Sequence, residues 1–197
     1  MQDQSSIRKH IKGLRQALSP EQQQSLSQGI CQQLIDSKII STAKHIAIYL
    51  PVRGEADPTP ILTNTVIDQD VSKQFYLPVL SPAKKNHLAF AKYGKDSVMK
   101  LNRFKIPEPD VPNEELLDDP SVLDCVITPL VGVDPQGNRI GMGGGFYDRT
   151  FAFKKASNEK PLLIGFCYDF QMIASQSPQD WDVPVDAIVT ESSLKLL

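Results

Sequence analysis

The sequence contains few of the residues that build metal centres, disulfide frameworks or membrane anchors. Its three cysteines are odd in number and far apart, and its three histidines are equally scattered. This excludes a disulfide frame and a zinc site of the usual ligand spacing. No apolar stretch is long enough to span a membrane, and the first residues lack the apolar core of a signal peptide. We therefore expect a cytoplasmic protein with reduced thiols and no membrane partner.

A strong charge of either sign is also missing. The 21 basic and 23 acidic residues give a formal net charge of −2. This balance excludes binding to nucleic acid through overall charge, so we expect no nucleic-acid partner. What is present is an ordinary globular composition, 41% hydrophobic over 197 residues. That length suits one domain over residues 1–197, and no repeat or linker divides it.

Apolar patterning predicts helices at the start of the chain and an alternation with strands afterwards. Residues 7–18 place apolar side chains on one helical face, and "SPEQ" at 19–22 is a capping box that opens a second helix. Asp57-Pro58 predicts a helix through residues 61–67, and residues 106–112 read as a rigid surface loop. Short apolar runs predict strands at 45–51, 73–80, 87–93, 123–133, 161–168 and 185–191. The expected fold is α/β, with a mostly parallel sheet covered by helices on both faces.

The stretch "GNRIGMGGGFYDRTF", residues 137–151, concentrates the glycines of the chain. It follows the buried run 123–133 and precedes an aromatic segment with helical character. Glycines allow backbone N–H groups to converge on an anion, and ligands of open α/β sheets bind where loops leave the carboxyl ends of strands. Arg139 and Arg149 flank the run and suit phosphate, while Asp148 suits a magnesium ion.

The glycine run matches neither of two familiar nucleotide loops. It lacks the lysine pattern of a Walker loop, and Phe146 stands where a dinucleotide fingerprint requires glycine. The alternative to an anion cradle is the flexible end of a hairpin that needs positive φ.

Other charged residues leave two interpretations open. Arg8, Lys12 and Arg15 form a basic stripe on the first helix, and such a stripe is usually a solvated face. Glu55 follows a strand end and is either a turn residue or a ligand contact. Asp182 and Asp186 lie near the last predicted strand and are either caps or a second carboxylate for the same metal as Asp148.

Several blocks of the chain together resemble the 5-formyltetrahydrofolate cyclo-ligase (methenyltetrahydrofolate synthetase) family. They are "YLPVRGEADPTPIL", "IPEP", "ITPLVGVD", "GNRIGMGGGFYDRTF" and "WDVPVDAIVT", and they occur in the family's order across nearly the whole chain. The resemblance implies a three-layer α/β/α fold like that of sugar-phosphate isomerases and coenzyme A transferases. It implies an ATP- and Mg²⁺-dependent ligase that converts 5-formyltetrahydrofolate into 5,10-methenyltetrahydrofolate with release of ADP and phosphate.

The resemblance also implies site residues. The expected ATP-binding residues are Arg8, Arg139, Ile140, Gly141, Met142, Gly143, Gly144, Gly145, Phe146 and Tyr147. The expected folate-binding residues are Leu50, Glu55, Met142, Gly143, Gly144, Gly145 and Phe146. Asp148 and Asp186 match the magnesium ligands, and Arg149 and Tyr147 are the expected catalytic residues. The expected partners are ATP and folate alone, bound by a monomer.

The chain departs from the family at two positions. Gly144 and Gln4 stand where many members carry phosphate-contacting lysines. These absences keep a different class open, a folate- or nucleotide-binding module without turnover. Within enzymes, the implied fold leaves a phosphate-ester isomerase or an acyl transferase as the alternative, although the paired aspartates favour a metal-dependent ligase.

Overall fold

The computed structural model describes residues 3–63, 72–156 and 160–197. The strands are β1 His45–Ala47, β2 Gln74–Leu80, β3 Leu88–Tyr93, β4 Met99–Leu101, β5 Pro107–Pro109, β6 Cys125–Thr128, β7 Gly132–Val133, β8 Arg139–Ile140, β9 Leu162–Phe166, β10 Ala187–Val189 and β11 Leu194–Leu196. The α-helices are α1 Gln4–Ala17, α2 Pro20–Asp36, α3 Ile39–Thr42 and α5 Phe146–Thr150. The 3-10 helices are η1 Thr59–Thr63, η2 Asn113–Glu115, η3 Pro120–Val122, η4 Ala152–Lys155 and η5 Asp169–Gln171.

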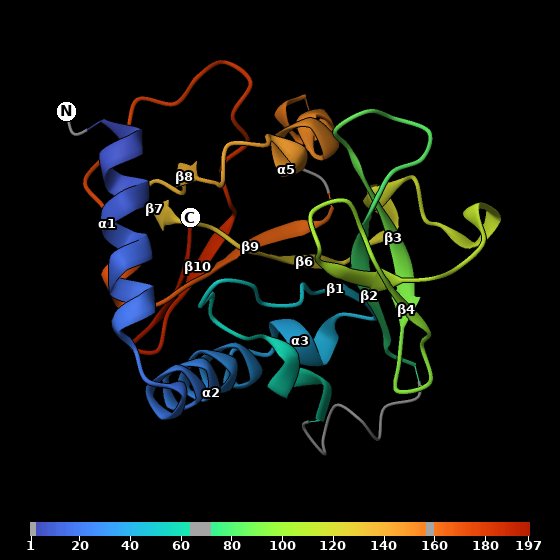
Figure 1. Ribbon diagram of the computed structural model, residues 1–197, viewed down its shortest axis with the longest axis horizontal. Coiled ribbons are helices and arrows are strands. Elements are labelled where there is room, and N and C mark those ends of the chain that lie inside the picture. Colours follow the sequence, from blue (N-terminus) through green and yellow to red (C-terminus); the bar gives the residue numbers. More distant parts are fainter. Residues whose placement is uncertain (1–2, 64–71, 157–159) are drawn as a thin grey trace.

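A seven-stranded sheet forms the centre of the molecule (Figure 1), in the order β11-β10-β9-β6-β1-β2-β3. Neighbouring strands from β10 to β2 run parallel, whereas β11 and β3 pair antiparallel at the two edges. The predicted mostly parallel α/β fold is therefore confirmed. The carboxyl ends of the five parallel strands lie along one edge of the sheet, where open α/β sheets bind their ligands.

Helices cover both faces of the sheet, because successive side chains of a buried strand point to opposite sides. In β6, Cys125 and Ile127 pack into the cluster that contains Ile30 and Leu34 of α2. Val126 points the other way, into the cluster that contains Phe151 beside α5. Helices α2 and α5 accordingly lie on opposite sides of the sheet (Figure 1).

The two N-terminal helices form where the sequence predicts them. Ser19 accepts a hydrogen bond from the Gln22 N–H at 3.2 Å, and the Gln22 side chain accepts one from the Ser19 N–H at 2.8 Å. This capping box starts α2 at Pro20. Helix α1 packs Ile7 and Ile11 against the cluster of the β7–β8 hairpin. It stands at the left of the molecule in Figure 1, beside β7 and β8.

Three sequence predictions about single elements need correction or fall partly outside the described residues. The run 123–133 is two strands, because β6 ends before Pro129 and β7 pairs with β8 in a separate ribbon. Residues 106–112 contain strand β5, which pairs antiparallel with β4. The helix expected over 61–67 is a 3-10 turn, η1, up to Thr63, and its remainder lies outside the described residues.

Candidate active site

The segment after β1 holds Glu55 in the interior of the protein. Positive φ angles at Arg53 (54°) and Gly54 (75°) turn the chain back, and the Glu55 N–H donates to the Val52 carbonyl at 3.1 Å. The Glu55 carboxylate in turn accepts the Val52 N–H through Oε2 at 3.1 Å. The residue is only 8% exposed. Burial is the main cause that raises its pKa, against the opposing effects of the Val52 hydrogen bond and of Arg15 and Arg53.

Arg15 of α1 is a buried cation that faces this carboxylate. Its Nη1 lies 3.9 Å from Oε1 of Glu55, and its Nη2 donates to the Leu130 carbonyl after β6. Gln171 donates to the same carbonyl at 2.8 Å. Arg15 is 4% exposed, so the prediction that it belongs to a solvated stripe is wrong. The segments that follow β1 and β6 cover the end of α1, and periodicity within the helix does not reveal them.

Two tyrosines complete the surroundings of Glu55. The Tyr49 hydroxyl donates to the Ala56 carbonyl at 2.6 Å. Burial raises the pKa of Tyr49, and the nearby Glu55 carboxylate raises it further. Burial and then Glu55 also raise the pKa of Tyr147 in α5, while Arg139 lowers it. Both hydroxyls therefore stay protonated at neutral pH, which makes them hydrogen-bond donors there and not bases.

The glycine loop, residues 141–145, connects β8 to α5 and presents free backbone N–H groups. Gly143 and Gly145 have φ angles of 94° and 63°, values that favour glycine. Within the described parts of the chain, none of the N–H groups from Met142 to Gly145 donates a hydrogen bond to another protein group. The loop is not a hairpin end, since the β7–β8 turn precedes it. Unpaired N–H groups in glycine-rich backbone form an anion-binding cradle.

Helix α1 also contacts this loop. Arg8 donates from Nε to the Gly141 carbonyl at 2.9 Å and from Nη2 to the Gln4 side chain at 3.0 Å. Arg8 and Arg15 are two helical turns apart on one face of α1. The helix therefore touches the glycine loop with one arginine and Glu55 with the other.

Arg139 and Asp148 form an ion pair beside the loop. Nη2 of Arg139 lies 2.7 Å from Oδ1 of Asp148, and Nη1 donates to the Val183 carbonyl at 2.6 Å. The Val183 N–H donates to the same Asp148 oxygen at 3.3 Å. The guanidinium also lies 5.8 Å from the centre of the Tyr147 ring. One face of α5 is thereby held against the segment before β10.

Asp186, the other expected magnesium ligand, has different partners. Its Oδ2 accepts the Leu163 N–H at 2.7 Å and lies 3.2 Å from Nζ of Lys154. Asp182 accepts the Gln179 N–H at 2.8 Å within a turn, and none of the described helices begins at Asp182, so it is not a helix cap. Among the described residues, no group of three or more histidine, cysteine or acidic side chains is arranged to hold a metal ion.

The remaining expected contact residues differ in exposure. Ile140 is buried against α1, whereas Met142 is 57% exposed. Leu50 is half-buried against the core on the α2 side of the sheet. The Phe146 ring meets Phe104 of the β4–β5 hairpin edge to face, with ring centres 5.8 Å apart. Sequence reasoning missed Phe104, because the proline-rich segment beside it gave no sign of a hairpin that reaches the loop.

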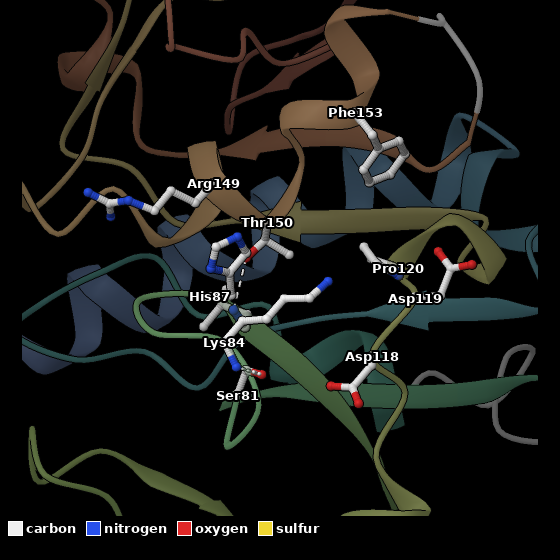
Figure 2. A pocket seen from close by; sticks show the side chains of 10 residues that line it. Ser81, Lys84, His87, Asp118, Asp119, Pro120, Arg149, Thr150 and Phe153 are labelled. Carbon is white, nitrogen blue, oxygen red and sulfur yellow. Dashed lines mark hydrogen bonds between the residues drawn. The ribbon is translucent and has the colours of Figure 1, made fainter.

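Arg149 lies on the exposed side of α5. Its Nη1 donates to the Gly144 carbonyl at 2.7 Å. It also lines a pocket of about 360 Å³, together with Lys84, His87, Asp118 and other residues. Figure 2 shows Arg149 extending away from these neighbours, while Lys84 points among them. Arg149 thus lies between this pocket and the glycine loop, whereas Glu55 and Asp148 do not line the pocket.

Comparison with known proteins agrees with this arrangement. The model of the 5-formyltetrahydrofolate cyclo-ligase family matches residues 1–191. The 5-formyltetrahydrofolate cyclo-ligase of Escherichia coli strain K12 is 36% identical, and the match covers 93% of this chain and 98% of the relative. The enzyme of the same name from Haemophilus influenzae is 35% identical over 93% of this chain and 95% of its own.

Solved structures show the same fold. The 5,10-methenyltetrahydrofolate synthetase of Aquifex aeolicus superposes with a TM-score of 0.79 at 28% identity, over 98% of this chain and 92% of that one. The 5,10-methenyltetrahydrofolate synthetase from Mycoplasma pneumoniae superposes with a TM-score of 0.68 at 24% identity, over 96% of this chain and 99% of that one. At this identity the likeness supports the fold alone. On the family match and the sequence identities together, this chain belongs to the 5-formyltetrahydrofolate cyclo-ligase family.

Proposed function

We propose that the protein catalyses the ATP-dependent ring closure of 5-formyltetrahydrofolate to 5,10-methenyltetrahydrofolate. The observation that carries the proposal is the run of unpaired backbone N–H groups from Met142 to Gly145, which helix α1 links to a buried carboxylate at Glu55. An amide cradle suits phosphate, and a buried carboxylate suits the N–H groups of a heterocycle. Family membership is the reason for proposing that ATP and the folate bind at these groups together.

ATP is proposed to lie against the glycine loop and the residues beside it, from Arg139 to Tyr147, with Arg8 at its α1 side. Arg8 already contacts Gly141, so its guanidinium is positioned beside the cradle. The folate is proposed to lie between Leu50, Glu55 and the loop. Phe146 would face its aromatic part, because that ring is already half-exposed against Phe104.

The proposed reaction has two steps. The formyl oxygen attacks the γ-phosphorus of ATP, which releases ADP and leaves an iminium phosphate. N10 then attacks the formyl carbon and loses its proton to solvent, and the carbon–oxygen bond breaks as phosphate leaves. Both steps need positioning and stabilisation of negative charge, which the amide cradle and Arg149 would provide. The protonated Tyr147 hydroxyl would donate a hydrogen bond to an oxygen of the transferring group.

A magnesium ion fits the aspartates only in part. The second oxygens of Asp148 and Asp186 have no hydrogen-bond partner among the described residues, and Mg²⁺ typically uses one or two carboxylates with phosphates and water. Each aspartate is nevertheless paired with a cation, Arg139 or Lys154. We propose that Asp148, beside the cradle, and Asp186 hold the ion, which would neutralise charge on the phosphates.

The cell compartment is also part of the proposal. All three cysteines are free and buried, and burial raises the pKa of Cys31 and Cys125 to about 12. Buried thiols of this kind suit a reducing compartment, and we propose that the protein acts in the cytoplasm, as a monomer. Among the described helices, none has the length and apolar character needed to cross a membrane.

The test is a spectrophotometric assay with 5-formyltetrahydrofolate and Mg-ATP that follows the methenyl chromophore. Absorbance should grow only when both ATP and the metal are present. The alternative is a binding module without turnover, favoured by Gly144 and Gln4 in place of lysines. Folded protein that binds the folate but produces no chromophore would establish that alternative and overturn the ligase.

A further inference from the structure

The buried ion pair of Arg15 and Glu55 has a geometry that is unusual for a pair that only stabilises the fold. Both side chains are at least nine-tenths buried, at 5% and 7% exposure, yet the closest nitrogen and oxygen are 3.9 Å apart. That separation is too long for a hydrogen bond. In addition, the Nε of Arg15 has no hydrogen-bond partner among the described residues. Burying two charges costs free energy that only good geometry and hydrogen bonds recover, so fold stability alone does not account for the pair.

The position of Arg15 indicates what the pair does. Burial raises the pKa of Tyr49, Tyr168 and Cys167, at the carboxyl ends of β1 and β9, and the nearby charge of Arg15 opposes that rise in all three. The Leu130 carbonyl after β6 accepts its Nη2. Arg15 is therefore surrounded by the ends of three adjacent parallel strands, where a ligand is expected. Arg15 is itself buried, and the neighbouring Glu55 carboxylate is the charged group that it faces.

We propose that Arg15 is a positioning residue that keeps Glu55 ionised and oriented for the N–H groups of the folate heterocycle. This inference rests on the proposed function. Oε2 of Glu55 is occupied by the Val52 N–H, while Oε1 faces Arg15 without a direct hydrogen bond. A carboxylate can accept further donors only while it is ionised, and the buried guanidinium is the neighbouring charge that favours this state.

The groups that face Glu55 set the expected direction of the pH effect. They are Arg15 on α1, Arg53 in its own turn, Tyr49 after β1 and Tyr147 on α5. The tyrosines are neutral, so removal of Arg15 leaves only the Val52 hydrogen bond and Arg53 to oppose the effect of burial on the pKa of Glu55. The carboxyl group should then keep its proton to higher pH. Folate binding in such a variant should fail at neutral pH and recover as the pH rises.

The experiment compares Arg15→Met and Arg15→Lys with Lys12→Met, an exposed residue on the same helix. For each variant, kcat/KM for 5-formyltetrahydrofolate is measured from about pH 5 to about pH 9, a range wide enough to locate the acid limb. Arg15→Met should lose at least about tenfold at neutral pH, through KM, with its acid limb moved up by about one pH unit. Arg15→Lys should restore most of the loss, and Lys12→Met should match the wild type.

A purely structural role predicts something else. Arg15→Met would then lower the melting temperature and the active fraction, while the acid limb and KM of the remaining enzyme stayed at their wild-type values. That result would overturn the proposal. If Arg15→Met fails to fold, Arg15→Lys and the double variant Arg15→Met/Glu55→Gln replace it. The double variant should bind folate weakly at every pH, because no carboxylate remains to titrate.

A failure of the proposed function would appear differently. Wild-type protein without ATP-dependent turnover would remove the ligase activity but not the pairing. The side-chain carboxyl ¹³C signal of Glu55, followed by NMR in the ligand-free protein, reports the pairing directly. It should titrate at higher pH in Arg15→Met than in wild type. Equal titration in both would overturn the inference whatever the enzyme does.

Discussion

At the scale of single residues, two glycines of one loop have opposite requirements. Gly145 has a φ of 63°, and a Cβ there would lie 2.8 Å from Nη1 of Arg149. Gly141 has no positive φ, and a Cβ there would meet nothing within 4 Å among the described atoms. Gly145→Ala should therefore lower the free energy of unfolding by about 1 kcal/mol or more. Gly141→Ala should change it by less than about 0.5 kcal/mol. Equal losses in urea titrations would contradict the assignment of strain to Gly145.

Asp148 pairs with the buried guanidinium of Arg139 and is also a proposed magnesium ligand, so its charge should matter for turnover. Asp148→Asn keeps an acceptor for Arg139 but removes the charge opposite a buried guanidinium. We expect turnover to fall by about 100-fold or more, because charge stabilisation near the phosphates is lost. Folate affinity, measured by calorimetry, should stay within about threefold, because the folate contacts are elsewhere. Asp182→Asn, a change at a nearby turn, is the matched control and should keep wild-type turnover. Full activity of Asp148→Asn would refute its proposed role.

Residue-scale prediction from the sequence succeeded where local chemistry decides and failed where distant segments meet. The glycine run required unusual backbone angles wherever it lay, and Gly143 and Gly145 have them. Arg15 was misplaced because the helix pattern reveals only which residues share a face. Its burial depends on segments after β1 and β6, which are far away in sequence. The sequence did contain one signal for Arg15: it lies seven residues after Arg8, which places both arginines on one face of α1.

At the scale of elements, caps and proline positions were readable, but strand pairing was not. The capping box at Ser19 fixed the start of α2 from four letters of sequence. The run 123–133 looked like one strand because its apolar character continues past Pro129. Proline has no N–H to donate, so the ladder stops there and the chain leaves for another ribbon. The β4–β5 hairpin was hidden because prolines at both ends of β5 argue against a strand.

Asp124 connects the starts of the parallel strands, and its removal should weaken them together. Its carboxylate accepts the N–H groups of Lys44 and His45 at 2.7 and 2.8 Å and pairs with Lys160. Although partial burial raises its pKa, the Lys160 and backbone hydrogen bonds prevail and lower it to about 2. Asp124→Asn should cost about 2 kcal/mol of unfolding free energy at pH 7.

The sign of the pH dependence provides the check on Asp124. A carboxyl group whose folded pKa is lowered contributes stability above its ordinary pKa of 3.8 and loses it as the pH falls toward 2. Wild-type unfolding free energy should therefore decline over this window more steeply than that of Asp124→Asn. Parallel declines in guanidinium titrations would show that other groups cause the acid sensitivity.

At the scale of the whole molecule, the order of the strands places the two ligand regions together. The sheet order brings β1, β6 and β9 side by side, so their carboxyl ends converge although β1 ends at Ala47 and β9 begins only at Leu162. Helix α1 then crosses this edge and touches the glycine loop through Arg8 and Glu55 through Arg15. Sequence patterning predicted a mostly parallel sheet, but the order of the strands within it became known only from the structure.

Ligand-linked thermal stability tests this arrangement over the entire protein. A ligand that binds only the folded state at about 100 times its Kd adds about 2.7 kcal/mol, which corresponds to a rise in Tm of roughly 5–10 °C for a chain of this size. A non-hydrolysable ATP analogue and 5-formyltetrahydrofolate should each produce such a rise. Arg8→Met should reduce the rise with the ATP analogue, because Arg8 is held beside the cradle by its bond to Gly141, and should leave the rise with folate intact. Loss of both rises would instead mean that α1 supports the fold and not the nucleotide.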